Sequence, residues 1–210
     1  MKPTGVVEVA VEEVVLGLYR AGLLRFGEFK LSSGVLSPFY IDLRSLPSHP
    51  GLYRVVVEEM ARVASGIDHD VVMGVESSGI IHAAFLSCLT GKPVGYVRKR
   101  GKDHGLRKRV EGVVNGRRVL VVDDVSTTGS SILDAVEVLR VEGAVVEDAL
   151  VIIDRGEGAG RLLGEHGVRL HRVLDARAVF SILEAKGLLE NGVSARIREY
   201  YIKRGFEPPI

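Results

Sequence analysis

The chain has 210 residues, enough for one domain with a substantial hydrophobic core. Hydrophobic residues make up 46% and charged residues 26%, a balance that excludes an intrinsically disordered chain. No apolar run approaches the ~18 residues of a membrane-spanning helix, and Glu8, Glu12 and Glu13 interrupt the apolar stretch that a signal peptide needs. The single cysteine, Cys88, excludes an intramolecular disulfide framework, and we expect it to fill part of the core of a cytosolic protein.

The positive charge is concentrated in one segment. Seven of the twelve residues 98–109 are Lys or Arg and one is Asp, so this segment carries +6 although the whole chain carries only +1. A nucleic-acid-binding protein usually spreads its basic residues over a face. The concentrated charge instead favours a compact polyanion as the partner. Gln is absent and Asn occurs only twice, which resembles the composition of thermophilic proteins.

The first third of the chain predicts a helix, a hairpin and a second helix. Apolar residues from Val6 to Leu24 recur at helical spacing, and we expect this helix to end at Gly27. Two short extended runs, 28–31 and 37–42, flank a Ser/Gly turn and predict a β-hairpin. Helical periodicity returns in residues 50–64, with a proline close to the start.

From residue 71 onward, short apolar runs alternate with segments of helical periodicity. Strands that are apolar on both faces predict an α/β fold, in which helices cover both sides of a mostly parallel sheet. The expected strands are 71–75, 94–97, 119–122, 149–153 and 168–170, and the expected helices are 79–89, 130–142 and 158–166. The tail 176–204 predicts two more helices, broken at Asn191-Gly192.

The segment with the clearest chemical signal follows the apolar run 119–122. Asp123 and Asp124 stand at the expected carboxyl end of a parallel strand, where such sheets bind ligands. A turn of small residues then leads into a helix, and its free amides and the helix dipole favour an anion. The turn comprises Val125, Ser126, Thr127, Thr128, Gly129, Ser130 and Ser131, and it matches neither a P-loop nor a dinucleotide motif. The alternative is an ordinary strand–helix turn whose Asp and Ser residues only cap the helix.

This segment resembles the phosphoribosyl diphosphate (PRPP) signature of the type I phosphoribosyltransferases. Three further motifs resemble the orotate phosphoribosyltransferase family: the hairpin 27–44, the basic loop that begins at Tyr96 and runs to Gly105, and Asp154-Arg155. The four motifs occur in the family's order. The Arg-Lys-x-x-Lys-x-His-Gly pattern of the loop is the most specific, because the adenine and hypoxanthine enzymes of the class lack it.

The resemblance implies the type I phosphoribosyltransferase fold, with an N-terminal helix-hairpin hood (1–46), an α/β core (47–175) and C-terminal helices (176–210) in one domain. It also implies transfer of a phosphoribosyl group from PRPP to orotate, which gives orotidine 5′-monophosphate and pyrophosphate. Asp123 and Asp124 would meet the ribose hydroxyls and the positive charge that develops on the sugar.

The remaining parts of the signature would hold the two ends of the reactants. Residues 125–131 would bind PRPP, with its 5′-phosphate held by residues 127–131. Thr127 and Arg155 would bind orotate, and the fork of the guanidinium suits its carboxylate better than a lysine would. A surface arginine with no ligand is the alternative for Arg155.

The basic loop is implied to close over the site and bind the diphosphate through cationic donors, which are Arg98, Lys99, Lys102 and His104. The resemblance further implies a homodimer, in which loop 98–109 reaches the neighbouring subunit's site. Mg²⁺ is implied as the cofactor, held mainly by PRPP rather than by protein ligands. A solvated basic loop is the alternative, and we expect Arg107, Lys108 and Arg109 to face solvent in either case.

Two positions depart from the family's bacterial pattern. Ser32 and Ser78 stand where many members carry lysines near the pyrophosphate. Lys30 lies on the same strand face as Ser32 and is a candidate replacement, and the turn Ser77-Ser78 still offers backbone amides. Five histidines show no metal-ligand spacing and are expected to be structural, namely His49, His69, His82, His166 and His171.

Two alternatives to an orotate enzyme remain. One is a phosphoribosyltransferase for another base, against which Arg155 and the Lys102/His104 loop argue. The other is a non-catalytic, PRPP-sensing regulator of the same fold, against which the intact loop and the lack of a basic helix-turn-helix argue. We expect a cytoplasmic protein that binds neither nucleic acid nor a membrane.

Overall fold

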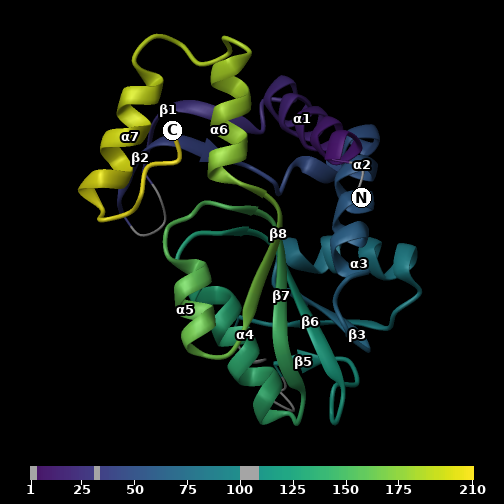
Figure 1. Cartoon of the computed structure of the whole chain (residues 1–210). Coiled ribbons are helices and arrows are strands. Elements are labelled where there is room, and N and C mark those ends of the chain that lie inside the picture. Colours follow the sequence, from purple (N-terminus) through teal and green to yellow (C-terminus); the bar gives the residue numbers. More distant parts are fainter. Residues whose placement is uncertain (1–3, 31–33, 100–108) are drawn as a thin grey trace.

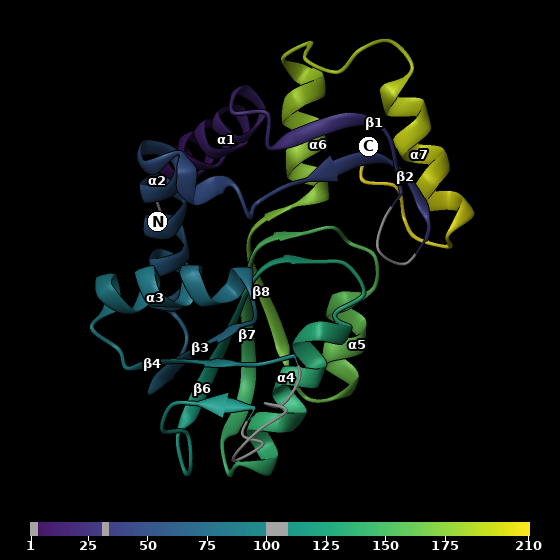
Figure 2. The same cartoon turned by 180° about the vertical axis from the view of Figure 1, so that it is seen from behind.

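Six strands form a central sheet with helices on both of its faces, and a second layer lies above one end of the sheet (Figures 1 and 2). The computed structural model describes residues 4–30, 34–99 and 109–210. The helices are α1 (Thr4–Arg20), η1 (Leu46–Ser48, a 3-10 turn), α2 (Pro50–Ala64), α3 (Ser78–Thr90), α4 (Ser130–Val141), α5 (Ala159–Glu165), α6 (Ala176–Ala185) and α7 (Val193–Lys203). The strands are β1 (Leu24–Lys30), β2 (Leu36–Ile41), β3 (Val71–Val75), β4 (Val94–Val97), β5 (Val110–Glu111), β6 (Arg118–Ser126), β7 (Val145–Asp154) and β8 (Arg169–Asp175).

The order of the strands fixes where a ligand can bind. The sheet runs β5-β4-β3-β6-β7-β8, and every neighbouring pair is parallel except β4 and β5. The chain passes from β3 outward to β4 and then returns to β6 on the other side of β3. In α/β sheets, ligands bind at the carboxyl ends of the strands where this reversal occurs. The topology therefore directs a site to the ends of β3 and β6.

Successive residues of the central strands are buried on opposite faces of the sheet. Leu120 and Val122 of β6 belong to the core that includes α2 and α3, whereas Val119 and Val121 pack with the buried face of α4. Both faces are covered, so the strand is apolar without interruption, as the sequence predicts.

Segments from the two ends of the sequence form the upper layer together. Phe39 of β2 packs edge-on against Phe180 of α6, with ring centroids 4.9 Å apart, and stacks on Tyr201 of α7 at 6.3 Å. The hydroxyl of Tyr19 in α1 donates to the carbonyl oxygen of Leu188 at 3.1 Å. The predicted hairpin and the predicted C-terminal helices are both present, and they share one apolar core (Figure 2).

The first helix ends earlier than its apolar pattern predicts. It ends at Arg20 rather than at Gly27, because Gly22 adopts φ = 69° and the amides of Gly22 and Leu23 bond back into the last turn. This Schellman arrangement closes a helix. Leu24 is buried as the first residue of β1, so its apolar character belongs to the strand.

The prediction that Cys88 lies in the core is also wrong. It is exposed on α3, beside Phe85 and Leu89, which are 51% and 55% exposed. Apolar residues surround α3 on almost every side, so its sequence does not indicate which face is inward; Ala83 and Leu86 occupy that face.

The sequence pattern predicts one strand too few in the sheet and makes others too short. β5 has two residues and leaves no apolar period, so it is absent from the prediction. β6 continues through the acidic pair to Ser126, and β8 continues to Asp175, because pairing with β7 extends to both residues.

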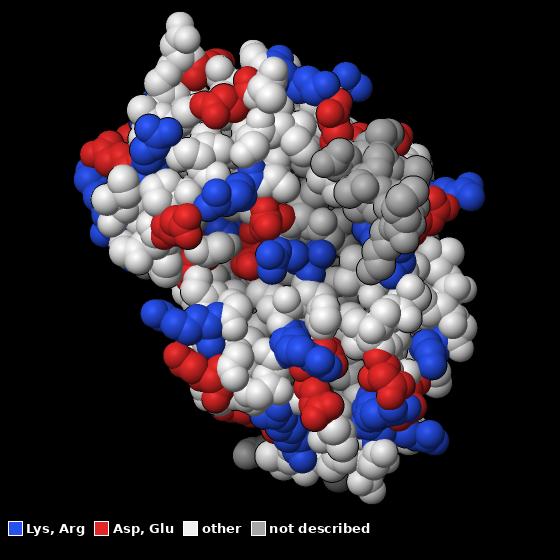
Figure 3. All heavy atoms as spheres, viewed as in Figure 1, with Lys and Arg blue, Asp and Glu red and all other residues white. Residues whose placement is uncertain are grey.

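Charged side chains of both signs are distributed over the surface. Lys and Arg side chains lie interspersed with Asp and Glu on the face shown in Figure 3. Across the described residues, no helix is both long and apolar enough to cross a membrane.

Two glycines allow α3 to lie directly on the backbone of the sheet. A Cβ at Gly74 of β3 would lie 2.5 Å from the carbonyl oxygen of Gly79, and a Cβ at Gly79 would lie 2.4 Å from that of Val122. The same Cβ at Gly79 would lie 3.2 Å from Oδ1 of Asp123. The first turn of α3 is therefore held against the acidic end of β6.

We expect Gly74→Ala to lower the free energy of unfolding by about 1–3 kcal/mol, because the methyl group would push α3 away from the sheet. Gly164→Ala is the matched control, since its Cβ would meet nothing within 4 Å and alanine favours its helix. Urea denaturation of both variants measures the difference. A Gly74→Ala variant as stable as the parent would show that close approach does not constrain α3.

Candidate active site

Two strand-to-helix turns meet where the connections of the sheet reverse. Ser77 and Ser78 follow β3, and residues 127–129 follow β6. The contact between Gly79 and Asp123 joins the two turns. The structure therefore brings together residues that the sequence analysis selected from separate motifs.

Asp123 and Asp124 are half-buried, and backbone amides hold both of them. Oδ1 of Asp123 accepts from the amide of Asp124 at 2.9 Å, and Oδ1 of Asp124 accepts from the amide of Val125 at 2.8 Å. Burial and the charge of Asp124 raise the pKa of the Asp123 carboxyl well above its usual range, and the charge of Lys99 opposes this. The pair therefore favours a ligand that brings hydroxyl donors or positive charge. The sequence predicts this pair at the end of the strand. It lies inside β6 instead, because the strand continues to Ser126.

The turn after β6 combines a helix start with exposed hydroxyl groups. Gly129 is the N-cap of α4 with φ = 85°, and a Cβ there would lie 3.1 Å from Cα of Ala159. Thr128 and Ser130 are exposed, with their hydroxyl oxygens 3.0 Å apart, and Ser131 is exposed beside them. The amide of Ser130 lies 3.5 Å from Oγ1 of Thr128. Because the N-cap residue Gly129 has no side chain, the following amides in the first turn of α4 are left for an anion.

The described end of the basic loop lies beside this turn. Arg98 and Lys99 line one side of an open pocket of about 220 Å³, and Ser130 and Ser131 line another. The amide of Lys99 donates to Oε2 of Glu76 at 2.9 Å. The predicted site residues Lys102 and His104 lie outside the described residues, as does Ser32.

Two arginines close the stem of the loop. Arg98 pairs with Glu111 at 3.3 Å and donates to the hydroxyl of Tyr96 at 2.8 Å, so its role as a ligand of the diphosphate stays a prediction. The prediction that Arg109 faces solvent is wrong. Its guanidinium binds both carboxylate oxygens of Asp134 and donates to the carbonyl oxygen of Arg98 at 2.9 Å, because the stem packs against α4.

Lys30 lies at the end of β1, where it is exposed and pairs in register with Leu36. Thr127 is half-buried at the start of the turn after β6. Neither residue has a contact that assigns it a role.

The ends of β6 and β7 are joined by short hydrogen bonds. The hydroxyl of Ser126 donates to Oδ1 of Asp154 at 2.8 Å, and this oxygen also accepts from the amide of Gly156 at 3.1 Å. The amide of Arg155 donates to the carbonyl oxygen of Ser126 at 3.0 Å. The predicted base-binding arginine is therefore fixed directly beside the predicted phosphate turn.

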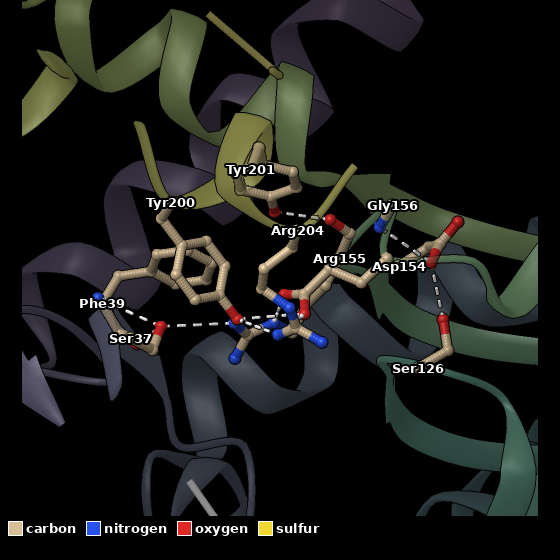
Figure 4. A network of polar contacts seen from close by, with 10 residues as sticks. Ser37, Phe39, Ser126, Asp154, Arg155, Gly156, Tyr200, Tyr201 and Arg204 are labelled. Atoms are coloured by element: carbon tan, nitrogen blue, oxygen red, sulfur yellow. Dashed lines mark hydrogen bonds and ion pairs between the residues drawn. The ribbon is translucent and has the colours of Figure 1, made fainter. Parts of the chain in front are cut away.

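Side chains from the hairpin, the turn after β7 and α7 converge on Arg155, which is 4% exposed (Figure 4). Its Nε donates to Oε1 of Glu157 at 2.6 Å, and its Nη2 donates to the hydroxyls of Ser37 at 3.3 Å and Tyr200 at 3.2 Å. The guanidinium carbon lies 4.2 Å from the ring centroid of Phe39. These contacts fix the plane of the guanidinium, so the surface-arginine alternative is wrong for this position.

Glu157 lies at the centre of this cluster and is 1% exposed. Besides Arg155, it accepts from Nη1 of Arg204 at 2.6 Å and from the hydroxyl of Tyr200 at 3.0 Å. Two guanidinium groups surround one carboxylate, so the cluster keeps a net positive charge that favours an anion. Glu157, Tyr200 and Arg204 were not among the predicted site residues. Tyr200 and Arg204 contact Glu157 across more than 40 residues and form no local motif with it. Glu157 stands two residues after Arg155, and this short spacing is the one signal in the sequence that could have pointed to it.

Comparisons with known proteins point to one family. Residues 46–164 match the family model described as the phosphoribosyl transferase domain. The orotate phosphoribosyltransferase of Staphylothermus marinus is 45% identical over 193 residues, which cover 92% of this chain and 95% of that protein. The crystal structure of orotate phosphoribosyltransferase from Aeropyrum pernix matches with a TM-score of 0.74 and 41% identity, covering 84% of this chain and 99% of that one. The Mycobacterium tuberculosis orotate phosphoribosyltransferase in complex with PRPP matches with a TM-score of 0.66 and 29% identity, covering 81% and 99%.

We expect Glu157→Ala to lower the free energy of unfolding by about 3–5 kcal/mol, because it leaves the buried Arg155 guanidinium without a counter-charge. Glu207→Ala removes a carboxylate from an exposed pair with Arg177 and should leave stability nearly unchanged. Urea denaturation compares the two variants. Equal stabilities would mean that the buried pair is no stronger than a surface pair.

Proposed function

Since the chain belongs to the orotate phosphoribosyltransferase family, we propose that PRPP and orotate meet at the carboxyl ends of β3, β6 and β7. The reaction transfers the phosphoribosyl group from PRPP to orotate and gives orotidine 5′-monophosphate and pyrophosphate. The observation that carries the placement is the link between the two halves of the site, in which the amide of Arg155 donates to the carbonyl oxygen of Ser126, within the PRPP signature.

The residues after β6 account for the sugar half of the reaction. We assign the 5′-phosphate to the amides and hydroxyls of residues 127–131, at the positive end of α4. Breaking the C1′–O bond leaves an oxocarbenium-like sugar. Asp123 and Asp124 lie beside this turn, where their carboxylates would hold the ribose hydroxyls and stabilise the developing positive charge.

The cluster around Arg155 accounts for the choice of base. Orotate differs from uracil by a carboxylate, and the net positive charge of two guanidinium groups and one carboxylate favours that group. Because Glu157, Ser37 and Tyr200 already hold the guanidinium, little side-chain entropy is lost when the base binds. Thr127, at the start of the phosphate turn, is assigned to the same base.

Mg²⁺ fits this site through its substrate. Among the described residues, no three His, Cys, Asp or Glu side chains form a group that would hold a metal ion. Burial and the charge of Asp124 raise the pKa of Asp123, and the charge of Lys99 opposes this only in part, so a cation carried by the diphosphate would be favoured beside the two carboxyl groups. Mg²⁺ binds readily through phosphates and waters with few protein ligands, and it would neutralise charge on the leaving group.

A homodimer is part of the proposal, and the outer face of α3 supports it. Ile81, Phe85 and Leu89 are 40%, 51% and 55% exposed, and Val94 of the adjoining β4 is 44% exposed. Contiguous exposed apolar side chains of this kind mark an interaction surface. A second copy would cover this face, and loop 98–109 would then complete the neighbouring site. We also propose a cytoplasmic location, in keeping with a single cysteine and a highly charged intracellular substrate.

A panel of bases tests the function. Pyrophosphate release from PRPP with Mg²⁺ should occur with orotate and not with adenine, hypoxanthine or uracil. Release with another base would favour that transferase, and PRPP binding without release would favour the regulator.

Kinetics distinguish the loop from the base pocket. Lys102→Ala should reduce kcat by on the order of 10²–10³, because a donor that engages the departing diphosphate acts mainly in the transition state. Its KM for PRPP should change far less, since residues 123–131 still hold the sugar and the phosphate. Arg155→Ala should instead raise the KM for orotate. A raised KM for PRPP with an intact kcat in Lys102→Ala would make the loop a docking surface.

Mixed subunits test whether the loop acts on the neighbouring site. At orotate concentrations well below the raised KM of Arg155→Ala, the Lys102→Ala and Arg155→Ala homodimers should each be nearly inactive, but their heterodimer has one site with both defects and one with neither. We expect activity to recover towards half of the parent value, as measured on heterodimers verified by mass spectrometry. Heterodimers that remain inactive would place the loop over its own subunit's site.

A further inference from the structure

Three polar side chains form a hydrogen-bond relay that leads from the buried face of α2 to the turn after β3. The hydroxyl of Tyr53 lies 3.0 Å from Nδ1 of His82, and Nε2 of His82 lies 3.3 Å from the hydroxyl oxygen of Ser78. Tyr53 and His82 are 4% and 0% exposed, whereas Ser78 is half-buried at the turn. The relay therefore connects the core to the candidate site through side chains alone.

Burial determines the protonation of the two inner members of this relay, Tyr53 and His82. Burial lowers the pKa of the His82 imidazole to about 4, although the charge of Asp124 acts in the opposite direction. Burial also raises the pKa of the Tyr53 hydroxyl. Near neutral pH, the relay thus consists of a phenol, a neutral imidazole and an alcohol, and these three side chains carry no net charge.

The need to satisfy buried donors gives the hydrogen bonds a direction. A buried phenol that finds no acceptor for its proton loses stability, and within the described residues the acceptor in contact with Tyr53 is Nδ1 of His82. Nδ1 then carries no proton, so the proton of the neutral ring is on Nε2. Nε2 donates to the oxygen of Ser78, and Ser78 must direct its own proton elsewhere.

The free direction of that proton is towards the candidate site. Ser78 begins α3, whose first turn lies against Asp123 through Gly79. An anion at this turn would meet the backbone amides of the helix start together with a hydroxyl whose proton is free to be donated. The diphosphate of PRPP is the anion that the proposed function brings to this place.

We propose that Tyr53 and His82 are positioning residues that fix the hydroxyl of Ser78 as a hydrogen-bond donor to the diphosphate. The inference rests on the proposed placement of PRPP at the turns after β3 and β6. It assigns functional importance to His82, which the sequence analysis expected to be structural.

A double-mutant cycle with inorganic pyrophosphate as the probe tests the proposal. The full chain with Mg²⁺ is titrated by calorimetry for the parent, Tyr53→Phe, Ser78→Ala and the double variant. Each single variant should raise the Kd for pyrophosphate by about three- to ten-fold, the scale of one hydrogen bond. The double variant should bind pyrophosphate no more weakly than Ser78→Ala, because Tyr53 and His82 act only through the hydroxyl of Ser78. The KM for orotate should not change.

Tyr19→Phe is the matched control, since its hydroxyl bonds to Leu188 in the upper layer, and it should bind pyrophosphate like the parent. An unchanged Kd in Tyr53→Phe with a raised Kd in Ser78→Ala would overturn the positioning role and leave the site intact. Additive losses in the double variant would also overturn it, since Tyr53 would then act through packing. An unchanged Kd in Ser78→Ala would remove the diphosphate from this turn and contradict the proposed placement itself.

Discussion

The close approach of α3 to the sheet is the constraint on which the site depends. The missing side chains at Gly74 and Gly79 let backbone meet backbone, so the turn after β3 lies against the acidic end of β6. With a helix at ordinary packing distance, the two turns would stand apart by roughly the width of a side chain. A ligand with phosphates at both ends needs both turns at once, and glycine is the residue that lets the backbone come that close.

The two halves of the site are built on different principles. The half after β3 and β6 uses backbone amides and helix ends, which are rigid because they belong to packed elements. The half around Arg155 uses long side chains, and these are rigid only because Glu157, Ser37 and Tyr200 hold them. The two halves are coupled through Ser126 and Asp154, so a change in either strand end affects both.

What the sequence predicts correctly is local. The apolar strands, the acidic pair and the glycine turn are contiguous signals, and the parallel sheet brings their ends together without further information. Contacts between distant segments leave no such signal: Glu157 binds Arg204 of α7, and the helix offers only an amphipathic pattern. Leu24 and Cys88 show a second limit, since an apolar residue fits a helix stripe, a strand or an exposed face equally well until its neighbours are known.

The position of Glu157 between two guanidinium groups also sets an order on evolutionary change. If Arg155 is lost first, Glu157 still pairs with Arg204 and Tyr200, so the fold tolerates the step. If Glu157 is lost first, a buried cation is left unpaired. A pocket that has lost both Arg155 and Glu157 would have to regain the glutamate first. At that step the glutamate alone would not yet favour a carboxylate ligand. If the pocket selects the carboxylate of orotate as proposed, this selectivity is therefore easier to lose than to recover.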